Sequence, residues 1–202
     1  MGKKNSKNYP KFIVVDGGDG AGKDTQARLI AYYYLQKGFN VRIRSHPVPD
    51  NLFGRFSKKA LEGGGMKGHL KASVFYTADV IRSLVKYYRH SNREVIIFSR
   101  YLLGVCYLPS SLVFAAYNFF ATILPIGVYF FFIDVTPENA IKRITGRGEK
   151  GEMFETLPRL QKMQHKMRQV TYRKKWFIIN GNKEPEAVWH QIRKILVKLD
   201  SR

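Results

Sequence analysis

Residues 17–25, GGDGAGKDT, combine glycines, a lysine and acidic side chains at a spacing that suits polyphosphate binding. Gly17, Gly22 and Lys23 match the phosphate-loop pattern G-x-x-x-x-G-K. Glycines let successive backbone N–H groups point inward, the following helix adds the positive end of its dipole, and the lysine reaches the outer phosphates. We therefore predict that ATP binds to the whole loop, which comprises Gly17, Gly18, Asp19, Gly20, Ala21, Gly22, Lys23, Asp24 and Thr25.

The metal-binding end of this loop departs from the pattern. The residue after the lysine is normally Ser or Thr, whose hydroxyl binds Mg²⁺, whereas here it is Asp24, followed by Thr25. A carboxylate is also a hard oxygen ligand, so Asp24 is the candidate Mg²⁺ ligand. Its negative charge also lies close to the phosphates. The five histidines show no metal-ligand spacing.

Such a loop needs a buried strand before it and a helix after it, and the sequence predicts both. Residues 12–16, FIVVD, are apolar and β-branched, and residues 23–37 have helical periodicity that ends at Gly38. We expect four more strands, at 40–44, 94–98, 128–134 and 176–179. Helices are expected at about 70–88, 110–124, 137–144 and 185–199, with another inside the basic stretch 142–175. The alternation predicts a three-layer α/β fold: a mostly parallel five-stranded sheet with helices on both faces.

Two segments are expected to lie outside this regular pattern. Residues 1–11 are lysine-rich and predicted to be a flexible basic tail, so that residues 12–202 form a single domain. The glycine-rich region 47–71 is predicted to be variable, with a mobile loop at 61–69.

The composition limits the partners and the compartment. A net charge of +20 fits phosphorylated small molecules, nucleic acid or an anionic membrane surface equally well. The single cysteine, Cys106, allows no internal disulfide, and no secretory signal is visible, so we expect a cytoplasmic protein. Residues 112–133 are uncharged, but Pro125 divides them into a helix-length and a strand-length piece. We therefore expect a buried helix and a central strand there, and no membrane partner.

Three motifs, in this order and spacing, resemble those of thymidylate kinases from Phe12 to about Leu199. They are the loop GGDGAGKDTQ, the strand end Ser99-Arg100-Tyr101, and the segment IDVTPENAIKRI. The resemblance implies a P-loop kinase fold with a lid at about 143–155. It also implies a role in nucleotide biosynthesis, the ATP-dependent phosphorylation of a nucleoside monophosphate, foremost dTMP to dTDP, with Mg²⁺ as the cofactor.

The same resemblance assigns roles to individual residues. Asp19 would lie beside the acceptor, Arg100 would clamp its phosphate, and Phe75 or Tyr76 would stack on its base. The lid residues Arg143 and Arg147 would neutralise charge on the transferring group. Lys23 would hold the outer phosphates of ATP, and the loop at 180–183 would pass the adenine. The family also implies a homodimer, for which the uncharged stretch 112–133 offers a contact.

Three positions depart from the family pattern. Asp24 replaces a hydroxyl residue, Ser99 replaces the carboxylate of D-R-Y, and Val80 stands where F-x-A-D-R has an arginine that reads the base. The first two departures exchange chemical types at the metal. The two changes can compensate for each other, because one carboxylate and one hydroxyl are still present at the metal. Alternatively, they arose independently and weakened the enzyme. Val80 leaves the identity of the base open.

Two other functions remain open from the sequence. The acceptor can be another nucleoside or deoxynucleoside monophosphate, because the base-reading arginine is absent. Alternatively, the chain can be a non-catalytic nucleotide-dependent protein that uses its positive charge to bind nucleic acid. The sequence has no recognised nucleic-acid-binding module, so we expect small nucleotides rather than nucleic acid as partners.

Overall fold

The computed structural model describes residues 10–62, 65–88, 94–125, 129–146 and 156–201. Its centre is a five-stranded parallel sheet in the order β2-β3-β1-β4-β5. The strands are β1 (Lys11–Gly17), β2 (Asn40–Ser45), β3 (Glu94–Ser99), β4 (Tyr129–Asp134) and β5 (Phe177–Asn180). Each predicted strand is present, and the predicted fold class is confirmed. Because β1 begins at Lys11, it takes in the last residue of the segment predicted to be a tail.

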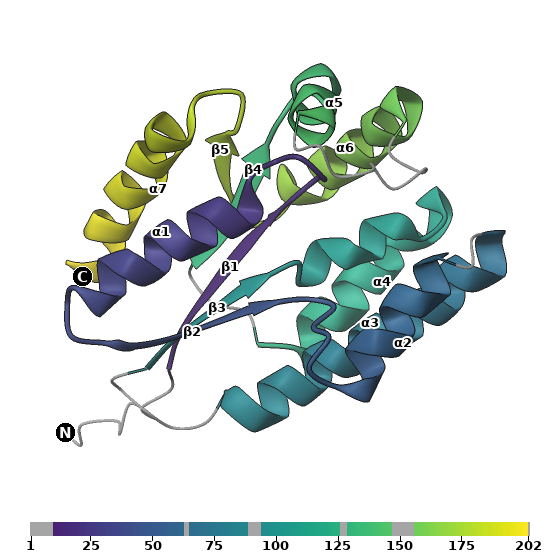
Figure 1. Cartoon of the computed structure of the whole chain (residues 1–202), viewed down its shortest axis with the longest axis horizontal. Helices are drawn as coiled ribbons and strands as arrows, with labels where there is room; N and C mark the ends of the chain where they lie inside the picture. Colours follow the sequence, from purple (N-terminus) through teal and green to yellow (C-terminus); the bar gives the residue numbers. More distant parts are fainter. Residues whose placement is uncertain (1–9, 63–64, 89–93, 126–128, 147–155, 202) are drawn as a thin grey trace.

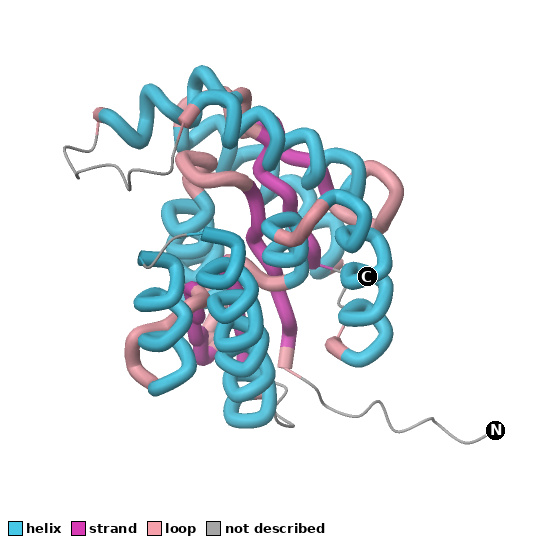
Figure 2. The backbone as a smooth tube through the Cα atoms, turned by 90° about the vertical axis from the view of Figure 1, so that its right-hand side faces the viewer, coloured by secondary structure: helices cyan, strands magenta, loops and turns pink. Residues whose placement is uncertain are grey.

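Helices cover both faces of the sheet, as Figures 1 and 2 show. Side chains alternate along β1, so Ile13 and Val15 enter one core while Phe12 and Val14 enter the other. The first core contains residues of α1 (Lys23–Leu35) and α7 (Pro185–Asp200). The second contains residues of α3 (Gly65–Tyr87), α4 (Ser110–Ile123) and the 3₁₀ helix η1 (Leu102–Tyr107). Burial on both faces explains why the strands read as continuous apolar runs.

Two further helices frame the carboxyl edge of the sheet. Helix α5 (Pro137–Thr145) follows β4, and α6 (Leu157–Thr171) lies next to it. Asp134 at the end of β4 accepts hydrogen bonds from Gln164 Nε2 (2.9 Å) and Arg168 Nε (2.9 Å to Oδ2), which fix α6 against the strand. The residues 147–155, which contain most of the predicted lid, lie outside the described residues.

The prediction for residues 47–71 was wrong, because most of this region is helical. Helix α2 (Leu52–Glu62) occupies its centre, and α3 begins at Gly65, five residues earlier than expected. Asn51 caps α2, since its Oδ1 accepts a hydrogen bond from Gly54 N at 3.1 Å. Ser57 Oγ donates to Ala72 O at 3.0 Å and ties α2 to α3. Helices α2 and α3 therefore pack against each other, and of the predicted mobile loop only residues 63–64 fall outside the described part.

The uncharged stretch forms α4 and β4. The predicted central strand is confirmed, but the prediction of a buried helix was wrong. Helix α4 is only partly buried: Val113 and Tyr117 face the core, whereas Leu112 and Phe119 are 52% and 60% exposed. None of the helices in the described part of the chain has the length and apolar character needed to cross a bilayer.

Candidate phosphoryl-transfer site

The glycine-rich loop joins the carboxyl end of β1 to the first turn of α1. Gly22 caps α1 with φ 84°, and Gly20 has φ 73°, a left-handed conformation that strains residues with a Cβ. A Cβ on Gly20 would lie 2.6 Å from Ala140 O, so the loop runs against α5 with no room for a larger residue. The strand–loop–helix arrangement required for a phosphate cradle is therefore present.

Lys23 is held inside the loop. Its side chain is 4% exposed, and its Nζ donates to Gly18 O at 2.6 Å and lies 3.8 Å from Asp19 Oδ1. Burial, followed by the positive charge of Arg100, lowers the pKa of Lys23 to about 8. A polyphosphate in the loop would supply the negative charge that favours the ammonium form.

Arg100 comes to the same edge from the end of β3. Its φ of 59° is unusual for a residue with a side chain, and such backbone strain often marks functional positions. Arg100 Nη1 donates to Ser45 Oγ at 3.1 Å and lies 3.7 Å from Asp24 Oδ2, and Ser45 Oγ donates to Asp24 Oδ1 at 2.6 Å. The carboxyl ends of β2 and β3 and the first turn of α1 thus supply one connected group, at the edge where open α/β sheets bind ligands.

Asp24 is ionised within this group. Burial opposes its ionisation, but the Ser45 hydrogen bond and the charges of Arg100 and Lys23 outweigh burial and hold the pKa of Asp24 below its ordinary value. Ser45 was not singled out from the sequence. A serine that ends an edge strand gives no pattern that would distinguish it from any other surface serine.

The oxygen atoms near Asp24 suit Mg²⁺. Ser99 at the end of β3 is fully buried, and its Oγ has no hydrogen-bond partner. It adds slightly to the stabilisation of ionised Asp24, so the two exchanged positions lie close together. A carboxylate and a buried, unpaired hydroxyl are ligands that Mg²⁺ accepts. Among the described residues, this site included, no three His, Cys, Asp or Glu side chains are grouped closely enough to hold a metal ion, so any Mg²⁺ here would depend largely on phosphate and water oxygens.

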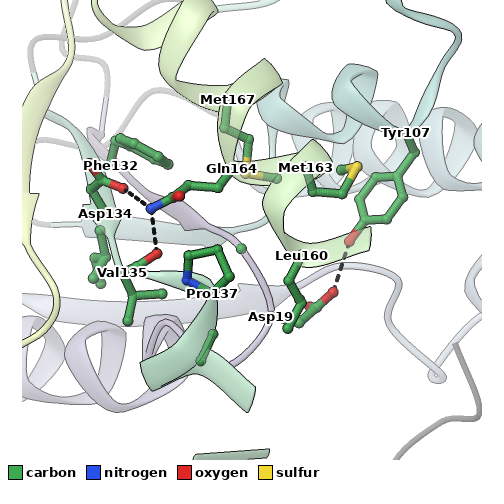
Figure 3. A pocket seen from close by; sticks show the side chains of 13 residues that line it. Asp19, Tyr107, Phe132, Asp134, Val135, Pro137, Leu160, Met163, Gln164 and Met167 are labelled. Atoms are coloured by element: carbon green, nitrogen blue, oxygen red, sulfur yellow. Dashed lines mark hydrogen bonds between the residues drawn. The ribbon is translucent and has the colours of Figure 1, made fainter. Parts of the chain in front are cut away.

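Asp19 is oriented by a residue that the sequence did not single out. Tyr107, at the end of η1, donates from its hydroxyl to Asp19 Oδ2 at 3.1 Å, as Figure 3 shows. Burial opposes ionisation of Asp19, but Lys23 and Arg100 hold its pKa below the ordinary value. The two side chains border a pocket whose other walls include Leu160 and Met163 of α6.

Asp16 fixes the backbone beneath the site. It is 2% exposed and accepts hydrogen bonds from Tyr101 N (3.0 Å), Leu103 N (3.2 Å) and Gly17 N (2.9 Å). Burial raises its pKa, and these donors act against that effect. The end of β1, directly before the loop, is thereby joined to the residues that follow Arg100.

The two aromatic candidates occupy different environments. Tyr76 lies against Gly104, donates from its hydroxyl to Tyr101 O at 3.0 Å, and is close enough to Arg100 to sense its charge. Phe75 instead faces α2, where its ring centroid lies 5.4 Å from that of Phe56. Tyr76 is therefore hydrogen-bonded to the residue that follows Arg100, whereas Phe75 packs against α2.

The candidate lid residues are only partly described. Arg143, in the last turn of α5, donates from Nη2 to Lys183 O at 3.0 Å and so contacts the loop between β5 and α7. Its transfer role remains a prediction. Arg147 lies outside the described residues.

Comparisons with known proteins agree on one family. A sequence profile of the thymidylate kinase family matches residues 15–192. A probable thymidylate kinase of Thermococcus onnurineus (strain NA1) is 30% identical over 172 residues, which cover 75% of this chain and 78% of that protein. A thymidylate kinase of Carboxydothermus hydrogenoformans is 26% identical over 206 residues, 94% of this chain and 98% of that protein. The structure of thymidylate kinase from Candida albicans matches the fold with a TM-score of 0.76 at 17% identity, over 95% of this chain and 93% of that one.

Proposed function

Because the chain belongs to the thymidylate kinase family, we propose that it transfers the terminal phosphate of ATP to dTMP and releases dTDP and ADP. The observation that carries this proposal is that Lys23 and Arg100 reach the same edge of the sheet and are linked through Asp24. One is suited to the donor phosphates and the other to the acceptor phosphate.

The residues of the chain supply position and charge rather than covalent chemistry. The loop amides and the Lys23 ammonium bind the outer phosphates of ATP, and the Arg100 guanidinium orients the acceptor phosphate. An acceptor phosphate oxygen is already a nucleophile at neutral pH, so the reaction needs no general base. Asp19, held by Tyr107, lies between the two and orients the acceptor. Tyr76, rather than Phe75, borders the acceptor's organic group.

Mg²⁺, when bound, would neutralise charge on the phosphates, and the Asp24 carboxylate and the Ser99 hydroxyl are the atoms that would hold it. Arg143 and Arg147 complete the proposal as the cations that neutralise the transferring group. The hydrogen bond from Arg143 to Lys183 O supports a position of Arg143 on the ATP side of the site, because Lys183 belongs to the loop expected to pass the adenine.

We further propose a homodimer in a reducing, cytoplasmic compartment. Val74, Ile81 and Val85 of α3 are 62%, 40% and 69% exposed and repeat at helical spacing. We propose this apolar face, instead of the stretch 112–133 expected from the sequence, as the contact with a second copy. Cys106 is buried and free, which fits a compartment where thiols stay reduced. Sedimentation equilibrium with Val85→Glu tests the dimer, since the variant should sediment as a monomer.

The enzymatic proposal is tested by coupled ADP release with ATP, Mg²⁺ and dTMP, and by calorimetry of ATP binding. Lys23→Met should reduce turnover by at least about a hundredfold, because it removes a preorganised positive charge from the outer phosphates. Lys198→Met, on the outer surface of α7, is the matched control and should leave turnover unchanged. Retained turnover in Lys23→Met, or no heat of ATP binding by the unmodified protein, would refute the proposal.

A further inference from the structure

A second pocket lies beside Arg100, between α3, η1 and α4. Tyr101 follows Arg100 directly and lines this pocket. Tyr76 also lines it, and the charge of Arg100 acts on the pKa of its hydroxyl. None of the described side chains that line the pocket is charged. Its apolar lining consists mainly of Val80, Leu102, Val105, Leu108, Phe120 and Leu124. An acceptor phosphate held at Arg100 therefore has an uncharged, mainly apolar cavity next to it.

The polar groups of this pocket are already used by the protein. Tyr76 OH donates to Tyr101 O at 3.0 Å, and Tyr101 OH donates to Pro125 O at 3.2 Å. Thr77 Oγ1 donates to Ser73 O at 2.9 Å within α3. These three hydroxyl protons cannot also be donated to a ligand.

This arrangement suits an apolar group better than a pyrimidine. A pyrimidine base brings two carbonyl groups and an N–H that lose water on entry, and leaving such groups unpaired costs binding free energy. An apolar group loses no hydrogen bond on entry and gains from burial. Val80, which is 2% exposed, increases the preference for an apolar group. Its methyl groups occupy the position at which the family pattern has an arginine that donates hydrogen bonds to the base.

The apolar surface also continues outward from the pocket along α4. Phe120 and Leu124 line the cavity, while their neighbours Phe119 and Ile123 are 60% and 55% exposed. The rings of Phe119 and Phe120 lie 5.3 Å apart, so the surface is continuous. A long apolar group could therefore begin in the pocket and extend over the outside of α4.

We propose that this site accepts a second class of substrate, monophosphate esters whose organic group is apolar. The inference rests on the proposed function, because the same loop supplies the phosphate. An oxygen of the ester's phosphate bonds to the γ-phosphorus of ATP as the bond from that phosphorus to the β-bridging oxygen breaks. ADP leaves with the electron pair, and the product is the corresponding diphosphate ester. No oxidant or reductant takes part.

The test is an acceptor panel with the unmodified protein, ATP and Mg²⁺. Farnesyl monophosphate, phenyl phosphate and dTMP are compared by ADP release, and the diphosphate products are identified by mass spectrometry. We expect kcat/KM for at least one apolar ester to equal or exceed that for dTMP. Phosphorylation of dTMP alone overturns this inference and leaves the proposed function standing. If none of the three acceptors yields a diphosphate product, both this inference and the proposed function are overturned.

Val80→Arg places a charged donor in the pocket. It should lower kcat/KM for the apolar esters by about tenfold and raise that for dTMP. Val197→Arg, at a position of α7 that is 50% exposed, is the matched control and should change neither value. Because a buried arginine can prevent folding, Val80→Thr is measured beside it. This variant keeps the shape of the side chain and adds a hydroxyl, so it should lower the ester-to-dTMP ratio in the same direction. An unchanged ratio in both variants refutes the assignment of the pocket.

Discussion

The exchange of chemical types at positions 24 and 99 yields a quantitative prediction. Asp24→Thr removes the acceptor of the Ser45 hydrogen bond (2.6 Å) and the ion pair with Arg100 (3.7 Å). The two charged side chains are 49% and 36% exposed, so solvent screening reduces their attraction to about 1 kcal/mol. Loss of the hydrogen bond adds about 1 kcal/mol. Together these terms lower kcat/KM for the acceptor by roughly tenfold to thirtyfold.

Separate measurements distinguish this effect from loss of ATP binding. Removing a negative charge beside the phosphates should leave the affinity for metal-free ATP equal or higher, so the loss should appear in kcat/KM for the acceptor. Because Asp24 is also the proposed Mg²⁺ ligand, the variant should need more Mg²⁺ for half-maximal turnover. Ser99→Asp in the Asp24→Thr background returns a carboxylate to the same group and should restore most of the loss. Ser99→Asp alone buries a second carboxylate near Asp24 and should be the least active of the set.

Turnover is measured as ADP release across a titration of Mg²⁺ for all four proteins. Glu186→Thr, at an exposed position in the first turn of α7, is the control and should change kcat/KM by less than about twofold. Higher turnover of Asp24→Thr than of the unmodified protein would refute compensation. Failure of Ser99→Asp to rescue the single variant would show that the two positions act independently.

Three shorter predictions follow from other contacts. Burial lowers the pKa of His46 to about 4, so between about pH 6.5 and 4 the unfolded state binds a proton that the folded state does not. The free energy of unfolding should therefore fall by up to about 3 kcal/mol as the pH is lowered through this window. His46→Phe should make the free energy of unfolding, measured with urea, less dependent on pH. Gly20→Ala meets Ala140 O at 2.6 Å and should weaken ATP binding in calorimetry; an unchanged Kd contradicts the strained loop. Tyr107→Phe removes the hydrogen bond that the Tyr107 hydroxyl donates to Asp19. It should lower kcat/KM for the acceptor by about fivefold, with unchanged ATP affinity.

Regular features were predictable from the sequence because local chemistry determines them. The runs FIVVD and EVIIF are mainly apolar because both faces of these strands are covered by helices, and such runs predict buried strands. The loop at 17–25 was recognisable from the spacing of Gly17, Gly22 and Lys23 between a strand and a helix. In the structure Gly20 and Gly22 have the positive φ that the turn into the helix requires. Arg100 was identified from the resemblance of Ser99-Arg100-Tyr101 to a family motif at the end of the third strand, and the structure brings it to Asp24, beside the loop lysine.

The missed features depend on tertiary contacts. Helix α2 was hidden by the glycines at 63–65, although Asn51 at its start is a recognisable N-cap residue. Nothing local marks Ser45 or Tyr107, since each acquires its role only from the partner that another element brings to it. The apolar pocket is likewise formed by three elements that are separated in the sequence.

The conformation of Arg100 links the fold to the proposed chemistry. A left-handed backbone costs a residue with a Cβ about 1 kcal/mol, so it persists only where surrounding contacts impose it. Asp16 supplies these contacts, because it accepts hydrogen bonds from Tyr101 N and Leu103 N directly after the turn. Asp24 and Ser45 then fix the guanidinium at the other end of the side chain. Both ends of Arg100 are therefore ordered before an acceptor arrives, so little of the binding free energy of the acceptor phosphate is lost in ordering this side chain.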